Sequence, residues 1–239
     1  MLFLNAPVQD SLYYLLAKEY GWDVYPNNRT NPSGASVLKD MFILAQQKYN
    51  ALFYAFANGD ILFDNGLVDT LESILFHNAE HERIYITGNR LNTNMERIMR
   101  PLFTTEDVGT WAQSKTEKRI QYSAQDYFVI SKNSFDWSLY PDLVIGRPGV
   151  DNYLTYVALK SKMTIIDGSR TILALHQKRG KSNGDGWINK DVNYNRHLMQ
   201  RAKIKGFSLK KVLNNRLPYF TDFDSDRNIV LCQRYPEFL

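Results

Sequence analysis

A short polar turn between two apolar runs is the part of this sequence best placed to do chemistry. The apolar run 51–57 stops at Asn58, Gly59 and Asp60, and apolar character resumes at residues 61–63. A near-continuous apolar run of this length is typical of a strand buried on both faces, as in a parallel α/β sheet. The Asp60 carboxylate is then expected just past the carboxyl end of a strand, where α/β folds bind their ligands.

The same residues support a second interpretation. Asn-Gly between two apolar runs is the strongest short-range signal for a β-hairpin. Asn58 and Gly59 could therefore form a simple hairpin turn. The two interpretations are compatible, and this stretch alone favours neither.

Composition places the chain among ordinary globular proteins, with 44% hydrophobic and 23% charged residues over 239 positions. The net charge of +4 is too small to indicate a nucleic-acid partner by itself. Residues 196–216 carry only positive charges, which is typical of a solvated helix face; a positive rim for a diphosphate or an anionic acceptor is the functional alternative. Cys232 is the only cysteine, which excludes an intrachain disulfide and a cysteine-based zinc cluster.

Strand and helix patterns alternate over the first ~90 residues, which predicts an α/β fold with a doubly wound, mostly parallel sheet. Residues 92–99 are expected to be helical, residues 104–116 to form a mobile loop, and residues 178–187 to form a Gly-rich polar loop. No change in composition marks a linker, so residues 1–239 are predicted to form a single domain. The expected strands are 2–4, 22–25, 51–57, 61–63, 83–87, 127–131, 163–167 and 171–175, and the expected helices are 9–20, 36–49, 65–78 and 152–159.

Several segments, taken together, resemble the glycosyltransferases of the GT-A fold, the nucleotide-diphospho-sugar transferases. They are NPSGASVLKDMF (31–42), ALFYAFANGDILFD (51–64), AQDYF (124–128), YPDLVIGRPGVDNYL (140–154) and TILALHQ (171–177). The resemblance covers about residues 30–200, and the order and spacing of the motifs carry it. It implies a single GT-A-like domain, with a Rossmann-like, mostly parallel or mixed sheet flanked by helices.

The resemblance also implies a metal site. Asn58-Gly59-Asp60 is similar to the Asp-x-Asp motif that holds a divalent metal against the diphosphate of a nucleotide sugar. Asp60 and His176 are then the expected ligands of Mn²⁺, or of Mg²⁺, since oxygen ligands with an occasional imidazole suit these ions. A hydrogen-bonded histidine at a strand end is the alternative for His176. Asn58 stands in the first acidic position and would contact the metal or the ribose hydroxyls.

Other residues would act on the donor and the acceptor. Asp151, in the first turn of a predicted helix, is the candidate general base; stabilisation of the helix terminus is its ordinary alternative. Asp126, just before a predicted strand, would bind donor or acceptor hydroxyls or be an ordinary loop residue. Arg147 would meet a phosphate or pair with a carboxylate, and Lys178 opens a basic loop that would close over the diphosphate. Trp137 would stack on a sugar ring or fill the core.

Two departures from the family pattern support an alternative function. Asn58 supplies no carboxylate, and the chain begins at what corresponds to the second strand of the fold, so the strand and helix that hold the base and ribose are expected to be shortened or absent. A catalytically degenerate GT-A-like domain that binds a glycan or a protein is therefore the alternative to an active transferase. The expected partners of the transferase are a nucleotide-sugar donor and a glycan or other hydroxyl acceptor.

The sequence shows no signal peptide and no segment approaching the ~18 apolar residues of a membrane span. We expect a soluble chain, located in the cytoplasm, or in the Golgi lumen if the sequence is trimmed.

Overall fold

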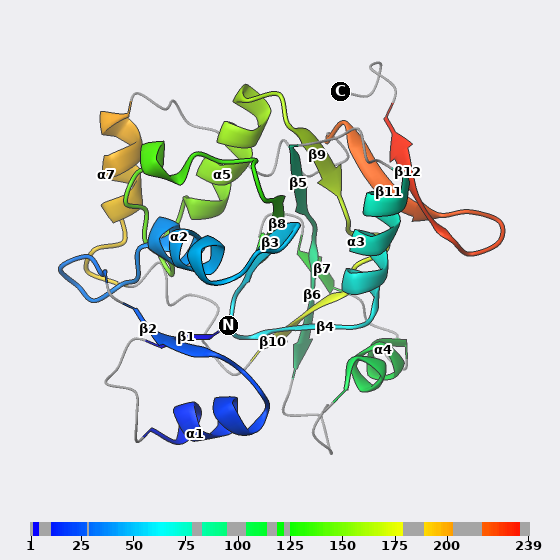
Figure 1. The fold of residues 1–239 in the computed structure, drawn as a ribbon, viewed down its shortest axis with the longest axis horizontal. Helices are drawn as coiled ribbons and strands as arrows, with labels where there is room; N and C mark the ends of the chain where they lie inside the picture. The colour runs from blue at the N-terminus through cyan, green and yellow to red at the C-terminus, as the bar shows by residue number, and fades with distance from the viewer. Residues whose placement is uncertain are drawn as a thin grey trace. The chain divides into compact units, whose positions relative to one another are not determined.

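The computed structural model describes most of the chain, which has an α/β fold (Figure 1). Two compact units are present: unit 1 comprises residues 1–54, 135–150 and 184–205, and unit 2 comprises residues 55–134, 151–183 and 206–239. The organisation of residues 1–239 as a single domain stays a prediction. The described residues are 2–4, 11–27, 29–77, 83–94, 104–113, 119–121, 125–178, 189–202 and 217–234.

Unit 1 combines helices with a small parallel sheet formed by β1 (Leu2–Leu4) and β2 (Val24–Pro26). Its other elements are α1 (Leu12–Glu19), α2 (Leu38–Lys48), the 3₁₀ turn η2 (Trp137–Leu139) and α7 (Tyr194–Arg201). Trp137 is only 3% exposed and stacks on Phe42, with ring centroids 4.3 Å apart. Its indole therefore fills the core of unit 1, and of its two predicted roles the structure supports this one.

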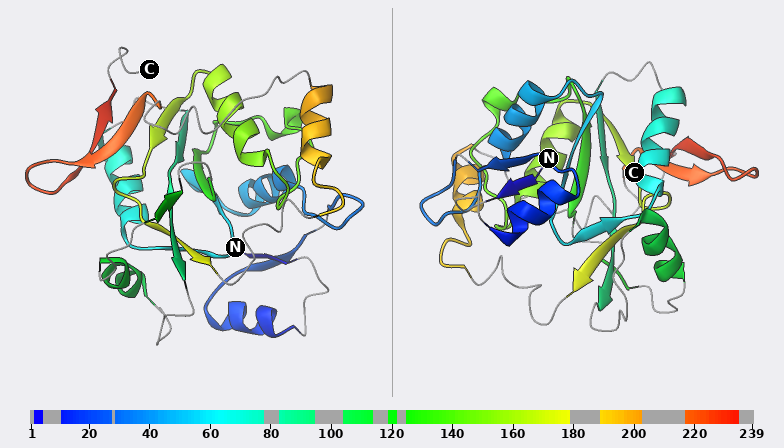
Figure 2. Two further views of the ribbon diagram at one scale, coloured as in Figure 1. Left: turned by 180° about the vertical axis from the view of Figure 1, so that it is seen from behind. Right: turned by 60° about the horizontal axis from the view of Figure 1, so that its bottom comes forward.

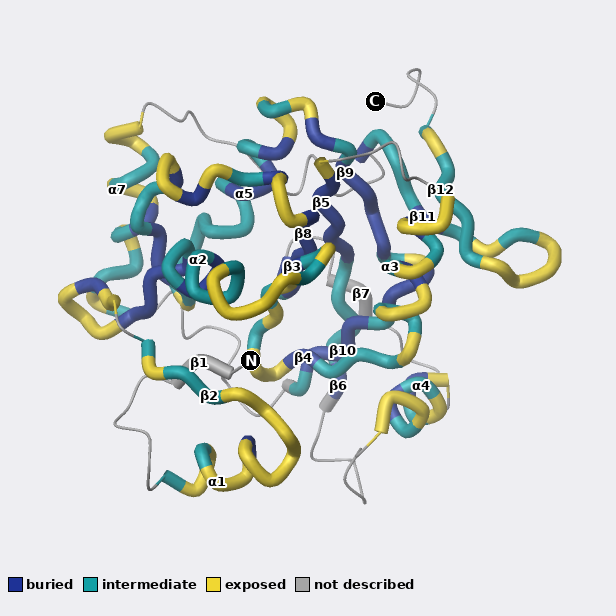
Figure 3. The backbone as a smooth tube through the Cα atoms, viewed as in Figure 1, coloured by how far each residue is buried: buried dark blue, intermediate teal, exposed yellow. Residues whose placement is uncertain are grey.

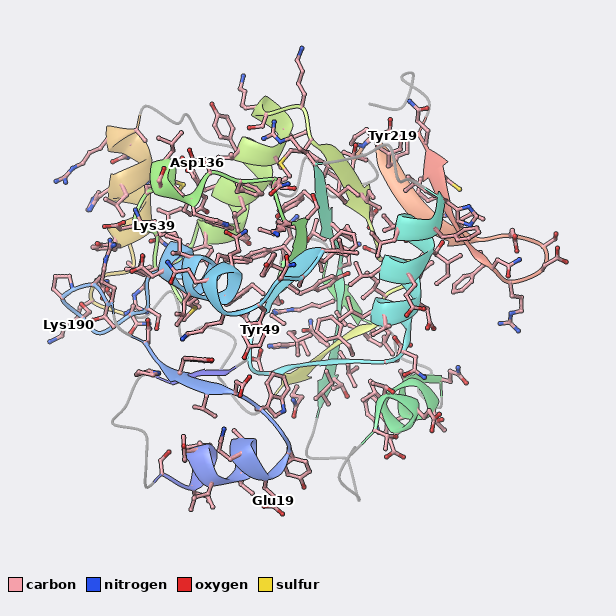
Figure 4. All side chains as sticks on the ribbon, in the orientation of Figure 1. Glu19, Lys39, Tyr49, Asp136, Lys190 and Tyr219 are labelled. Atoms are coloured by element: carbon pink, nitrogen blue, oxygen red, sulfur yellow. The ribbon has the colours of Figure 1, made fainter. Side chains whose placement is uncertain are left out.

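Polar contacts complete unit 1 around α2. Lys39, labelled in Figure 4, donates to the Tyr140 carbonyl at 2.9 Å and pairs with Asp142 at 2.7 Å. Asn195 of α7 is fully buried and bonds both the amide and the carbonyl of Val144. These contacts fasten residues 140–144 to the two helices.

Unit 2 contains a six-stranded mixed sheet with the order β12-β11-β9-β5-β8-β3. The central strands β5 (Ile84–Thr87) and β8 (Tyr127–Ser131) are buried at every residue, as Figure 3 shows. β9 runs parallel to β5 and β11, whereas β8 is antiparallel to β5 and β12 is antiparallel to β11. The other strands are β3 (Phe53–Ala57), β9 (Thr164–Asp167), β11 (Tyr219–Phe223) and β12 (Ile229–Gln233).

A second sheet in unit 2 has four strands in the order β4-β10-β6-β7 (Figure 2). β10 (Ala174–Lys178) pairs antiparallel with β4 (Ile61–Phe63) and parallel with β6 (Arg90–Asn94). β7 (Arg119–Gln121) pairs antiparallel with β6. The chain therefore leaves the six-stranded sheet after β3 and enters the four-stranded sheet at β4.

That topology corrects both interpretations of the turn at residues 58–60. β3 and β4 belong to different sheets, so the hairpin interpretation is wrong. The expectation of a strand buried on both faces is also wrong, because β3 is an edge strand in which only Tyr54 is buried. An edge strand has a neighbour on one side only and keeps more of its surface in water.

Two further segments differ from expectation. Residues 92–94, predicted as helical, belong to the strand β6, which pairs with β10 and β7; residues 95–99 lie outside the described part. The predicted loop 104–116 contains the helix α4 (Thr105–Gln113). Thr104 Oγ1 accepts from the Asp107 amide at 3.0 Å, and the Thr104 amide donates back to the Asp107 carboxylate at 3.3 Å. This reciprocal cap starts a helix that apolar periodicity alone does not reveal.

Two helices pack on the six-stranded sheet through buried hydroxyl groups. α3 (Gly66–His77) reaches β11 through a chain in which Thr171 Oγ1 lies 2.8 Å from Thr70 Oγ1 and 2.6 Å from Thr221 Oγ1. α5 (Val150–Lys160) bonds β5 through Thr155 and Tyr85, whose oxygens are 3.1 Å apart. No helix among the described residues is long and apolar enough to cross a membrane.

Gly88 follows β5 at a point where two backbone segments come close. A Cβ built there would lie 2.3 Å from the Tyr127 hydroxyl and 3.1 Å from the Ser169 amide nitrogen. Within the described residues the buried Tyr127 hydroxyl has no hydrogen-bond partner. Both a side chain at residue 88 and this hydroxyl should therefore cost stability.

We expect Gly88→Ala to lower the free energy of unfolding by about 1–3 kcal/mol, because it overpacks a filled site. Tyr127→Phe removes an unpaired hydroxyl and should leave that free energy unchanged or raise it by ~1 kcal/mol. In the Tyr127→Phe background the alanine should cost less, which a double-mutant cycle in urea measures. Strictly additive effects would contradict the close approach.

Candidate functional site

The turn at residues 58–60 is held from both sides within unit 2. The Asn58 amide donates to the Asp126 carbonyl at 2.9 Å, which ties the end of β3 to the start of β8. The Asp60 carbonyl accepts from the Gln177 amide at 2.9 Å, which ties the turn to β10. The side chains that follow β3 are therefore carried to the edge of the four-stranded sheet.

Asp60 and His176, the two expected metal ligands, lie side by side. His176 Nε2 is 3.0 Å from Asp60 Oδ2, although 116 positions separate the residues along the chain. The imidazole side chain is 5% exposed and the carboxylate 51% exposed, so the pair is anchored in protein and open to solvent at Asp60. The hydrogen bond from His176 is the main reason that the pKa of Asp60 is lowered, and the charge of nearby Arg90 contributes to the same shift.

Asn92 fixes the other side of the imidazole. Its Oδ1 lies 3.1 Å from His176 Nδ1, and the two residues are register partners in the parallel pairing of β6 with β10. Both ring nitrogens thus face oxygen atoms, and a neutral imidazole can donate to only one of them. Nε2 donates to Asp60 in one tautomer of the ring, and Nδ1 donates to Asn92 in the other. Metal-binding histidines characteristically donate their other ring N–H to an oxygen acceptor in this way.

A second group of contacts centres on Asp126. Its Oδ1 accepts from Asn58 Nδ2 at 2.8 Å, and its Oδ2 forms an ion pair with Arg90 Nη1. The side chains of Arg90 and Asp126 are 11% and 12% exposed. Asn58 therefore acts on Asp126 in this structure, as a positioning residue for the carboxylate.

Arg90 and Asn92 are functional candidates that sequence reasoning missed. They stand two residues apart on β6, so both side chains lie on one face of that strand. The available signal was the pattern Arg-x-Asn-x-Asn directly after the apolar strand β5. We call Asn58, Asp60, Arg90, Asn92, Asp126 and His176 the polar network.

Asp151 lies in the first turn of α5, as predicted. Burial raises its pKa to about 6, and the charge of Asp126 acts in the same direction. The helix position alone would lower the pKa, so the surroundings of the carboxyl group prevail over the helix dipole. An aspartate that titrates near neutral pH can accept a proton from a hydroxyl group.

The two remaining predicted residues are Arg147 and Lys178. Arg147 belongs to unit 1, where its Nε pairs with Asp191 Oδ1 at 2.5 Å and its Nη1 donates to the Gly146 carbonyl. Of its two predicted roles, the structure shows the pairing with a carboxylate. Lys178 ends β10, but its side chain lies outside the described residues. The basic loop after it and residues 203–216 of the basic run also lie outside them.

The polar network meets the donor requirements of a hard divalent cation only in part. Two neighbouring ligands of an octahedral ion with bonds of about 2.1 Å lie about 3.0 Å apart, and the Nε2 to Oδ2 distance is 3.0 Å. Among the described residues no group of three or more His, Cys, Asp or Glu side chains could hold a metal ion. Mg²⁺ usually binds through one or two protein groups together with substrate phosphates and water. Asp60 and His176 therefore fit an ion that a phosphate ligand completes.

Comparisons of the chain with protein-family models, with curated proteins and with solved structures gave no match.

The raised pKa of Asp151 predicts a pH-dependent stability. The pKa is about 6 in the folded chain and about 3.9 in an unfolded one. The folded state then holds more protons between these values, so stability falls as pH rises from about 4 to 6 and stays lower above it. Asp151→Asn removes the cost, and we expect it to be more stable than wild type at pH 7.5 by up to roughly 3 kcal/mol.

Urea unfolding of both proteins at pH 4 and pH 7.5 tests this expectation. The difference in the free energy of unfolding between wild type and Asp151→Asn should be small at pH 4, where the Asp151 carboxyl group is largely neutral. Asp69 is the matched control, because it stands in the first turn of α3 but is exposed. Asp69→Asn should lose about 0.3–1 kcal/mol at pH 7.5. Destabilisation by both substitutions at pH 7.5 would contradict an ionised Asp151 carboxylate that costs stability.

Proposed function

We propose that this protein is a metal-dependent glycosyltransferase that moves a sugar from a nucleotide-sugar donor to a hydroxyl acceptor. The observation that carries the proposal is the 3.0 Å contact between Asp60 and His176. Both residues were expected to hold the metal from their motifs alone. Because 116 positions separate the two residues in the sequence, only the fold brings them into contact.

Asp60 and His176 would hold Mn²⁺ or Mg²⁺. The bound ion would supply Lewis-acid stabilisation of the charge that develops on the departing nucleoside diphosphate. Asn92 orients the imidazole through Nδ1, which leaves Nε2 toward Asp60. Asn58 and Arg90 hold the Asp126 carboxylate, which would accept hydrogen bonds from sugar hydroxyls.

Asp151 is the proposed general base. In the transfer, the acceptor oxygen forms a bond to the anomeric carbon, the bond from that carbon to the diphosphate oxygen breaks, and the acceptor hydroxyl loses its proton. The pKa of Asp151, about 6, leaves the carboxylate ionised at neutral pH and basic enough to take that proton. The charge of Asp126 contributes to the raised pKa of Asp151. Asp151 is therefore within electrostatic range of one member of the polar network.

A GT-A-like arrangement forms part of the proposal. A mixed sheet flanked by α3 and α5 agrees with the expected architecture, although the second sheet and the antiparallel β8 make it less regular than a doubly wound fold. The placement of Asp60 just past the end of β3 agrees with ligand binding at strand ends.

One observation favours the alternative, a GT-A-like binding module without catalysis. Asn58 is bonded to Asp126 through its side chain and its backbone, and it brings no carboxylate to the metal pair. A module of this kind would bind a glycan or a protein without needing the ion.

Thermal shift with nucleoside diphosphates and Mn²⁺ separates the two. Because the protein offers two metal ligands and a phosphate completes the ion, nucleotide and metal should stabilise the protein together far more than either alone. Binding at a hundredfold excess over Kd contributes about 2.7 kcal/mol. Asp60→Asn keeps the size of the side chain and should abolish the joint shift.

Asp222→Asn is the matched control. Asp222 lies on β11 and forms an exposed ion pair with Arg170. It should retain the joint shift with UDP or GDP. The absence of a shift in wild type with every nucleoside diphosphate would reject the transferase and leave the binding module.

A further inference from the structure

We infer that Arg90 is the residue that binds the diphosphate of the donor, and that Asp126 occupies its guanidinium until the phosphate arrives. This inference rests on the proposed function and names the protein's own phosphate ligand. It adds Arg90 to the expected phosphate ligands Arg147 and Lys178, whose roles stay predictions.

The position of Arg90 supports the assignment. Arg90 lies two residues before Asn92 on β6, and Asn92 contacts the imidazole of His176. Its charge acts on Asp60 as well as on Asp126. A phosphate group at the Asp60–His176 pair would therefore lie within the field of this guanidinium.

The guanidinium has unused hydrogen-bonding capacity. Its Nη1 bonds Asp126, whereas its Nε is buried and has no partner within the described residues. A buried donor without a partner costs free energy and calls for an explanation. Arginine binds phosphate through two parallel N–H groups, so a bound phosphate would use the free capacity of this side chain.

Asp126 resembles a phosphate group in charge. It presents a carboxylate oxygen to Arg90 and is itself steadied by Asn58 Nδ2 at 2.8 Å. A nearly buried ion pair of this kind contributes little net stability, because desolvation offsets the attraction. The pair is therefore better explained as a site in which carboxylate and phosphate compete for one guanidinium.

If carboxylate and phosphate compete for Arg90, substitutions of the two residues of this ion pair should change pyrophosphate affinity in opposite directions. Arg90→Gln removes the phosphate ligand, and we expect it to weaken pyrophosphate and UDP binding about 10- to 100-fold in the presence of Mn²⁺. Asp126→Asn removes the competing anion and should strengthen pyrophosphate binding about 3- to 10-fold. Isothermal titration calorimetry on the full chain measures both. A purely structural ion pair would make both substitutions weaken binding.

Three controls keep the result interpretable. The double variant Arg90→Gln with Asp126→Asn leaves no unpaired charge, so it tests binding if Arg90→Gln alone unfolds; it should bind as weakly as expected for Arg90→Gln. Arg170→Gln, which breaks the exposed pair with Asp222, should bind pyrophosphate as wild type does. Uridine, which lacks phosphate, should bind wild type and Arg90→Gln equally.

The outcomes separate the two proposals. If wild type binds neither pyrophosphate nor a nucleoside diphosphate, the proposed function fails and this inference fails with it. If wild type binds them and Arg90→Gln, or the double variant, binds as tightly, the role of Arg90 alone is overturned. If Arg90→Gln and Asp126→Asn both weaken pyrophosphate binding, the competition is overturned.

Discussion

The hydrogen bonds of Asp126 are the constraint on which the polar network depends. Its carbonyl and its carboxylate both accept from Asn58, and the carboxylate also pairs with Arg90. One residue thereby joins the end of β3, the start of β8 and the start of β6. These bonds add to the pairing of β3 with β8 and to the bond between the Gln177 amide and the Asp60 carbonyl, which together hold the turn at 58–60 beside His176.

The change of sheet after β3 determines which residues lie beside Asp60. A hairpin would return the chain along β3 and keep Asp60 at a surface turn. The chain instead pairs β4 with β10, and the register of β10 with β6 then places His176 beside Asn92. Buried and nearly buried polar groups are costly to assemble. Their concentration here is the pattern that ligand-binding sites show, together with a raised pKa at Asp151 and an Arg90 Nε that lacks a partner within the described residues.

Local sequence predicted the elements well where the apolar pattern was long and regular. The helices at 38–48, 66–77 and 150–160 and the strands at 84–87 and 127–131 agree with their predicted ranges to within a few residues. The prediction was wrong for α4 and β6, where capping and strand pairing determine the structure. α4 depends on a reciprocal cap at Thr104 and Asp107, and β6 is a strand because its backbone pairs with β10 and β7. Pairing of this kind overrides the weak local preference of a polar segment.

By itself the sequence determined which residues are candidates for chemistry: Asp60 and His176 at the ends of apolar runs, Asp126 before a strand and Asp151 in a first helical turn. Those features are local, since residue type and short-range periodicity act within a few positions. Only the tertiary structure decided which of them meet. It brought Asp60 to His176, gave Asp126 its partners Asn58 and Arg90, and assigned Arg147 to Asp191 in unit 1. It also raised the pKa of Asp151, because burial and neighbouring charge depend on chain segments distant in the sequence.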